Sequence, residues 1–395
     1  MIWLRIIDKL LNLWGSTVFH AKTGRHAVLS YMLIPPIKVP GYFSRVHNNR
    51  LKSFYIAKSL NQMGFDVEIR NYLRMDFEPG RDCALFIGHN ISFATIVKRL
   101  RTGVPRILII TGSYPQFGNE QQAIRARNLE ARRGIRLKVY EDNIVPDLSE
   151  NLELADRILV LGSEFVRNTY PEKYRHKMVL FNNILNVPLR KREISYRNFL
   201  FISSIGQVHR GLDLVLEVFA GRQEKLYVCS SFRQEPEFEA AYRKELHETE
   251  NVIPEGFMNM GSKRAAEVFS DCGFCILPSC SEGQSGSVLS AMGKSLLPII
   301  TRNCGIPNVE RYGWVIEGAG VEDVRDAVEA ALSADENELA RRRETMWRAM
   351  KDFTGAEFAA RFQQLAANVF PIAAARVEQA KSETAAEAEV AGRHG

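Results

Sequence analysis

The chain has 395 residues, enough for two domains with separate hydrophobic cores. Apolar residues make up 46% and charged residues 25%, an ordinary balance for a soluble globular protein that excludes a wholly disordered chain. The net charge of +6 is concentrated at the N-terminal end, where residues 1–50 carry seven Lys or Arg against one acid. This asymmetry predicts an anionic partner. Because no aromatic–basic RNA-binding pattern accompanies it, we expect an anionic membrane face and no nucleic acid.

Residues 1–14 are predicted to form an amphipathic helix. Its apolar face carries Trp3 and Trp14, and its polar face carries Arg5 and Lys9. The segment is too short and too charged to span a bilayer, and no small-residue cleavage site follows it. Two interpretations stay open: a helix lying in the membrane interface, and a helix packed on its own domain.

The six cysteines lie mostly inside apolar runs. The spacing of Cys272, Cys275 and Cys280 could suggest a metal site, but Cys275 lies in the middle of a predicted strand. No second Cys/His pair completes a zinc site. We therefore expect reduced, buried thiols and no metal.

The first half of the chain has the rhythm of a parallel α/β sheet. A helix is expected over 51–63, and a basic helix over 121–136 either exposes a solvated face or binds an anionic acceptor. A charged stretch over 187–197 is the expected linker. Strand-like runs occupy 26–37, 64–72, 83–88, 107–111, 158–162 and 178–183.

Polar residues follow several of these predicted strands, at the sheet edge where open α/β sheets bind ligands. His47 and Asn48 lie in the loop after the first strand, and His89 and Tyr114 follow the strands over 83–88 and 107–111. All four are candidates for a ligand site. A solvated loop or a helix cap would also explain the histidines.

The second half repeats the α/β rhythm, with a Ser/Gly-rich loop over 203–211 that opens onto a predicted helix over 212–219. Arg210 stands directly before Gly211 in this loop. From 373 onward the chain is rich in Ala and Glu and is expected to be disordered. Further strands are predicted over 198–202, 225–230 and 251–257, and helices over 232–250, 262–269, 321–334 and 335–370, the last with a break near 353–355.

The stretch over 273–307 combines strand, loop, helix and strand, and carries the chemistry. Its loop meets a helix N-terminus, where free N–H groups favour an anion, and Gly283 and Gly286 would let a phosphate approach the backbone. Glu282 would repel a bare phosphate, so we expect it to accept hydrogen bonds from hydroxyls. Phosphate and hydroxyls in one pocket indicate a sugar nucleotide.

This stretch resembles the donor-site signature of retaining GT-B glycosyltransferases, the "group 1" family. The family pattern is Pro-Ser-x-x-Glu-Gly, a second Glu eight residues after the first, and then Ala-Met. Ser290 stands in the place of the second Glu, so the resemblance leaves ribose recognition unassigned. The matching residues are Pro278, Ser279, Glu282, Gly283, Ala291 and Met292.

The resemblance implies an α/β GT-B fold, with two Rossmann-like domains facing each other across a cleft. An amphipathic helix (1–20) would precede an acceptor domain (21–190) and a donor domain (191–355), followed by a helix returning to the first domain (356–372) and a tail (373–395). Catalysis would rest on Glu282 against the donor sugar and Arg210 against its diphosphate, with His47, Asn48, His89 and Tyr114 on the acceptor side. The implied donor-binding residues are Ser204, Gly206, Arg210, Gly211, Asn259, Glu282, Gly283, Gln284, Ser285, Gly286 and Ser287.

The expected reaction transfers a sugar from a nucleotide sugar to a glycan or lipid-linked acceptor with retention, without cofactor or metal, in cell-surface polysaccharide synthesis. The expected location is the cytoplasm, peripheral to the inner face of the plasma membrane. Two rivals stay open. The missing second Glu would also suit a non-catalytic sugar-nucleotide-binding subunit, and the same fold serves GT-B epimerases.

Overall fold

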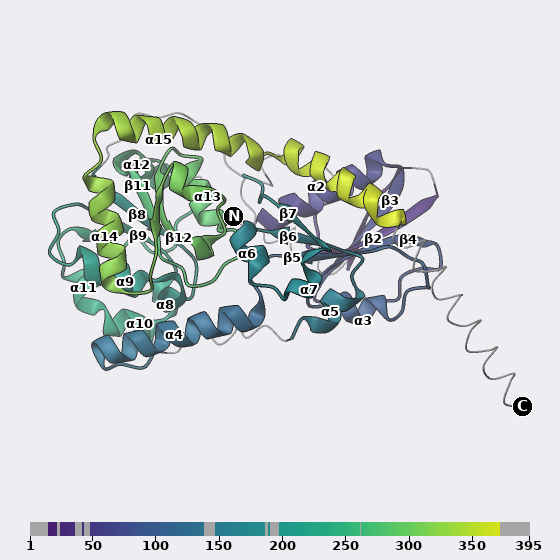
Figure 1. Cartoon of the computed structure of the whole chain (residues 1–395), viewed down its shortest axis with the longest axis horizontal. Helices are drawn as coiled ribbons and strands as arrows, with labels where there is room; N and C mark the ends of the chain where they lie inside the picture. The colour runs from purple at the N-terminus through teal and green to yellow at the C-terminus, as the bar shows by residue number, and fades with distance from the viewer. Residues whose placement is uncertain are drawn as a thin grey trace, which may run out of the picture.

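The computed structural model describes residues 15–21, 24–35, 42, 48–137, 147–185, 189, 197–260 and 262–371. The predicted helix over 1–14, His47 and the tail from 373 lie outside these residues. The described chain forms two α/β domains, each built on its own sheet (Figure 1). We call them the first domain (between 15 and 185) and the second domain (between 197 and 353).

The first domain has a seven-stranded sheet in the order β1-β3-β2-β4-β5-β6-β7. All neighbours are parallel except β1, which pairs antiparallel with β3. The sequence did not predict β1, and the strand expected over 26–37 ends at Tyr31, ahead of the Pro35-Pro36 pair. The strands are β1 (Ser16–Phe19), β2 (Arg25–Tyr31), β3 (Phe65–Asn71), β4 (Cys83–His89), β5 (Arg106–Ile110), β6 (Arg157–Leu161) and β7 (Met178–Phe181). The helices are α2 (Asn48–Gln62), α3 (Phe93–Val97), α4 (Pro115–Arg133), α5 (Ser149–Leu154), α6 (Glu164–Asn168) and α7 (Glu172–Arg175).

The second domain has a six-stranded parallel sheet in the order β10-β9-β8-β11-β12-β13. The single helix expected over 232–250 is divided into η2, α10 and α11, with a Pro at the first position of α10. The strands are β8 (Phe199–Ile202), β9 (Leu226–Cys229), β10 (Val252–Ile253), β11 (Phe274–Leu277), β12 (Leu297–Thr301) and β13 (Trp314–Ile316). The helical elements are α8 (Gln207–Arg210), α9 (Leu212–Phe219), η2 (Phe232–Gln234), α10 (Pro236–Ala241), α11 (Arg243–His247), α12 (Lys263–Asp271), α13 (Gly286–Met292), η3 (Arg302–Cys304), η4 (Val309–Arg311), α14 (Val321–Leu332), α15 (Glu336–Ala349) and η5 (Met350–Phe353).

Two helices tie the domains together. The helix over 355–371, yellow in Figure 1, returns to the first domain and buries Phe358, Phe362 and Val369 in its core. Conversely, α4 belongs to the first domain in sequence but lies along the second domain (Figure 1). Its Leu129 is buried in the core of the second domain.

The basic face of the helix expected over 121–136 is solvated only in part: Arg127 and Arg136 are exposed, as the sequence predicted, whereas two other arginines contact the second domain. Binding of an anionic acceptor by this face stays a prediction. Arg132 donates to Asp213 at 2.8 Å and to Glu217 at 2.7 Å, and Arg133 donates to Glu245 at 2.7 Å. Arg132 and Arg133 thus bind carboxylates of the second domain.

Candidate functional site

The strand order of the second sheet places the candidate site. The order reverses between β8 and β11, and parallel α/β sheets bind ligands at the carboxyl ends of the strands beside such a reversal. Arg210 is the last residue of α8, which follows β8, and Glu282 lies in the loop after β11.

These two residues form an ion pair. The Ser279 hydroxyl also donates to Glu282 Oε1 at 3.0 Å. The side chain of Arg210 is 21% exposed and that of Glu282 is 12% exposed, so the pair is shielded but still accessible from the cleft. The structure thus brings together the two residues that the sequence assigned to catalysis.

His209, which sequence reasoning did not select, fixes the two loops against each other. Its Nε2–H donates to the Ser281 carbonyl at 2.7 Å, and the Cys280 N–H donates to the His209 carbonyl at 2.9 Å. Burial lowers the pKa of His209 to about 3, and the charge of Arg210 acts in the same direction, so the ring stays neutral. His209 precedes Arg210 and Ser281 precedes Glu282, so the hydrogen bond between His209 and Ser281 fixes the spacing of the ion pair.

A second residue missed by the sequence, Glu235, holds the Ser/Gly turn after β8. Its carboxylate accepts from the N–H of Gly206 at 2.5 Å and from the N–H of Gln207 at 3.1 Å. Gly206 and Gly211 have φ of 86° and 78°, which only glycine adopts without strain. The Ser204 carbonyl accepts from the Gln207 side chain at 2.9 Å, and the Ser204 side chain is exposed.

The loop after β11 packs against the first domain more closely than the sequence suggested. A Cβ at Gly283 would overlap the Thr111 carbonyl, so in this structure Gly283 admits the first domain's backbone rather than a phosphate. The Ser281 hydroxyl meets the Ser113 hydroxyl at 2.5 Å. Gln284 is buried, and its amide Nε2 donates to Asn182 Oδ1 at 3.2 Å.

The loop after β11 leads into the N-terminus of α13, as predicted, but one of the N–H groups expected to be free there is bonded within the protein. The Ser285 N–H donates to the Cys304 carbonyl at 3.0 Å, so this amide is engaged within the protein. The Ser285 and Ser287 hydroxyls lie 3.1 Å apart, beside Gly286. Ser290, in the place of the family's second Glu, donates to the Gly286 carbonyl at 2.8 Å, so its hydroxyl is used inside the helix.

Among the acceptor-side candidates, Tyr114 lies with the catalytic pair. Tyr114, Arg210 and Glu282 line a cavity of about 220 Å³ between the domains. Its other residues include Asn90, Thr111, Gln122 and Tyr170. His89 is nearby through Thr111, whose hydroxyl lies 3.4 Å from its Nε2. Asn48 instead donates to the Ile184 carbonyl at 2.6 Å, and Asn259 is an exposed residue of the loop after β10.

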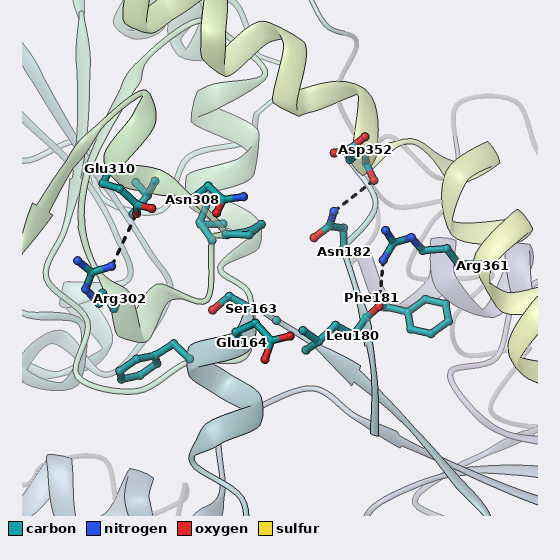
Figure 2. Close-up of a pocket in the computed structure, with 15 residues that line it drawn as sticks. Ser163, Glu164, Leu180, Phe181, Asn182, Arg302, Asn308, Glu310, Asp352 and Arg361 are labelled. Atoms are coloured by element: carbon teal, nitrogen blue, oxygen red, sulfur yellow. Dashed lines mark hydrogen bonds and ion pairs between the residues drawn. The ribbon is translucent and has the colours of Figure 1, made fainter. Parts of the chain in front are cut away.

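A larger cavity of about 400 Å³ lies elsewhere between the domains, at the end of β7 (Figure 2). In Figure 2, Arg302 faces Glu310, and Asn182 faces Asp352. Neither Arg210 nor Glu282 lines this cavity. We therefore place the site in the smaller cavity, which contains the ion pair. Among the described residues, no cluster of three or more His, Cys, Asp or Glu suits a metal.

A family model matches the part of the chain that contains the two residues of the ion pair. Residues 196–334 match the family model described as "Glycosyl transferases group 1", and this segment contains both Arg210 and Glu282. The second domain is thus similar to that of group 1 glycosyltransferases. No curated protein matches the chain.

Similarity to solved structures that together span both domains confirms the predicted GT-B fold. Staphylococcus aureus TarM, in complex with fondaparinux, alpha-GlcNAc-glycerol and UDP, has a TM-score of 0.51 at 15% identity over 77% of this chain. The chain spans only 59% of the length of TarM. Sucrose-phosphate synthase from Thermosynechococcus elongatus has a TM-score of 0.57 at 12% identity, covering 88% of this chain and 99% of its own. An Escherichia coli trehalose-6-phosphate protein bound with UDP-2-fluoro glucose has a TM-score of 0.56 at 9% identity, covering 86% and 99%. At these identities the likeness establishes the fold alone.

Proposed function

We propose that the protein is a glycosyltransferase that moves a sugar from a nucleotide-sugar donor to an acceptor hydroxyl, with retention at the anomeric carbon. The observation that carries the proposal is the Arg210–Glu282 ion pair at the strand reversal of a group 1 domain. A guanidinium matches phosphate oxygens in a planar fork and can stabilise a leaving diphosphate. The UDP and UDP-sugar in the TarM and E. coli structures support a uridine donor as the first to test.

In this structure the charges of Arg210 and Glu282 neutralise each other. An incoming diphosphate would take the place of Glu282 on Arg210, and the released carboxylate would accept hydrogen bonds from donor-sugar hydroxyls. The N–H groups of Gly286 and Ser287 would serve the same diphosphate.

The cavity also limits the mechanism. Among the described residues that line it, Glu282 is the only carboxylate, and Arg210 already binds it. We therefore propose a front-face reaction. The bond from the anomeric carbon to the phosphate oxygen breaks, and a bond to the acceptor oxygen forms on the same face. The acceptor proton passes to the leaving phosphate oxygen, so no side chain acts as nucleophile and no metal is required.

We further propose a glycan or lipid-linked acceptor, and peripheral attachment to the inner face of the plasma membrane. The basic excess of residues 1–50 supports this location. In the part of the chain that the structure describes, no helix is long and apolar enough to cross a bilayer.

The test is incubation of the full chain with a panel of nucleotide sugars, followed by NMR of the products. A transferase releases nucleoside diphosphate and shows slow donor hydrolysis, an epimerase yields a new nucleotide sugar, and a binding subunit yields neither. Glu282→Gln keeps the size and removes the charge, so turnover should fall on the order of tenfold or more, because hydrogen bonds to charged groups contribute about 1.5–3 kcal/mol. Turnover of the variant within a few-fold of wild type would remove Glu282 from the proposal.

A further inference from the structure

The first domain contains a cation that neither the ion pair nor the cavity uses. Lys52, in the second turn of α2, is 1% exposed, and its Nζ donates to Asn183 Oδ1 at 2.7 Å. Among the described residues it forms no ion pair with a carboxylate, and its single hydrogen-bond partner is a neutral amide. A buried ammonium without a counter-ion is unfavourable, and a bound anion would offset that cost by favouring the charged form.

The surroundings of Lys52 are polar but incompletely paired. His89 packs against Tyr31 with ring centroids 5.5 Å apart, and the charge of Lys52 adds to burial in lowering the pKa of His89. The Tyr31 hydroxyl and His89 Nδ1 are both buried and have no hydrogen-bond partner in this structure. These are groups that a ligand could engage, and none of them carries a negative charge.

Asn183 connects this cluster to the start of α13 in the second domain. Its Oδ1 accepts from Lys52 and from the Ile184 N–H, which fixes the orientation of the amide. Its Nδ2 therefore points across the cleft, where one N–H donates to the Gln284 carbonyl at 3.3 Å. The same nitrogen lies 3.8 Å from the place that a Cβ of Gly286 would occupy. The first domain thus directs an N–H donor, backed by a positive charge, at the turn beside Glu282.

We propose that Lys52 and Asn183 form the first-domain half of the diphosphate site. Asn183 would donate directly to a phosphate oxygen, and Lys52 would act as a positioning residue that orients the amide and supplies charge from behind. The inference rests on the proposed function. In this proposal, the anion that Lys52 and Asn183 bind is the diphosphate of the donor and not an anionic group of the acceptor.

The test compares Lys52→Met with Lys58→Met, an exposed lysine on the same helix. Full-length proteins are titrated with UDP and with inorganic pyrophosphate by calorimetry, with no acceptor present. Lys52→Met should weaken binding of both probes on the order of tenfold, as expected for loss of a charge-assisted interaction. Lys58→Met should bind as wild type does.

Proton linkage separates this role from a merely structural one. The pKa of Lys52 is lowered by burial to about 7, and an adjacent anion would raise it. Near pH 7.5, wild type and Lys58→Met should therefore take up a fraction of a proton on binding that Lys52→Met does not. Titration in buffers of different ionisation enthalpy measures this difference, and the probe's own titration is common to all three proteins.

Equal affinity in the two variants, or equal proton uptake, overturns the inference. If wild type still turns over a nucleotide sugar in that case, the proposed function stands. A wild-type protein that binds neither probe and turns over no donor overturns both.

Discussion

Replacing Lys52 by Met is expected to stabilise the folded protein, although it weakens diphosphate binding. The reason is that Lys52 is held in a site that disfavours its charge. Burial lowers its pKa from 10.5 to about 7, and among the described residues its only compensating contact is the hydrogen bond to Asn183. Met fills a similar volume with apolar atoms and leaves Asn183 Oδ1 with the Ile184 N–H as a partner.

The size of the effect depends on pH in a defined direction. A base whose pKa is depressed in the folded state reduces stability below its unfolded pKa, so the penalty is absent above pH 10.5 and grows as pH falls toward 7. At about 1.4 kcal/mol per pKa unit, the penalty is roughly 5 kcal/mol at pH 6, 3 kcal/mol at pH 8 and 1 kcal/mol at pH 10. Loss of the hydrogen bond to Asn183 offsets about 1 kcal/mol of this. Lys52→Met should thus gain roughly 4, 2 and 0 kcal/mol at these pH values.

The assay is urea unfolding of wild type, Lys52→Met and Lys58→Met at pH 6, 8 and 10, with linear extrapolation of the free energy of unfolding. The difference between Lys52→Met and wild type should shrink as pH rises, while Lys58→Met follows wild type throughout. A destabilised Lys52→Met, or a gain that does not change with pH, would refute the reasoning, because it would show that Lys52 supports the fold.

Two further predictions concern the donor site and the N-terminal segment. Arg210→Ala should weaken binding of a nucleoside diphosphate on the order of tenfold, and Arg210→Lys should recover much of it, since the positive charge is restored; unchanged affinity by calorimetry in Arg210→Ala would contradict the phosphate assignment. Full-length protein should co-sediment with anionic liposomes and release with salt, because each basic residue near such a surface contributes about 1 kcal/mol. A protein starting at Ala21 should stay in the supernatant, and failure of both proteins to bind would favour a helix packed on its domain.

The sequence predicted those parts of the structure that depend on local pattern. The apolar runs over 198–202 and 273–277 correspond to β8 and β11, which are neighbours in the sheet. Arg210 follows the first strand at the end of α8, and Glu282 follows the second strand in its loop. Strands β8 and β11 are neighbours in the sheet but not in the chain, so the two residues were assigned to one site through the resemblance to the group 1 family and not through the strand pattern.

The residues that the sequence missed depend on contacts between distant segments. Glu235 lies 29 positions after Gly206, and Asn183 lies 131 positions after Lys52. No periodicity links such pairs, so a charged residue on a predicted helix is indistinguishable from a solvated one. The same limit explains why the sequence did not predict that Arg132 and Arg133, in the helix expected over 121–136, bind carboxylates of the other domain.

The position of the loop after β11 therefore depends on contacts with the first domain and not on the sequence signature alone. The first domain holds it at Ser281 through Ser113, at Gly283 through the Thr111 carbonyl, and at Gln284 through Asn182. Glu282 lies between the first two of these contacts, so its position depends on the approach of the first domain. A signature of six matching residues can place a carboxylate on a loop. The cleft between the domains decides where that carboxylate points, and this explains why Lys52 and Asn183, far outside the signature, can belong to the same site.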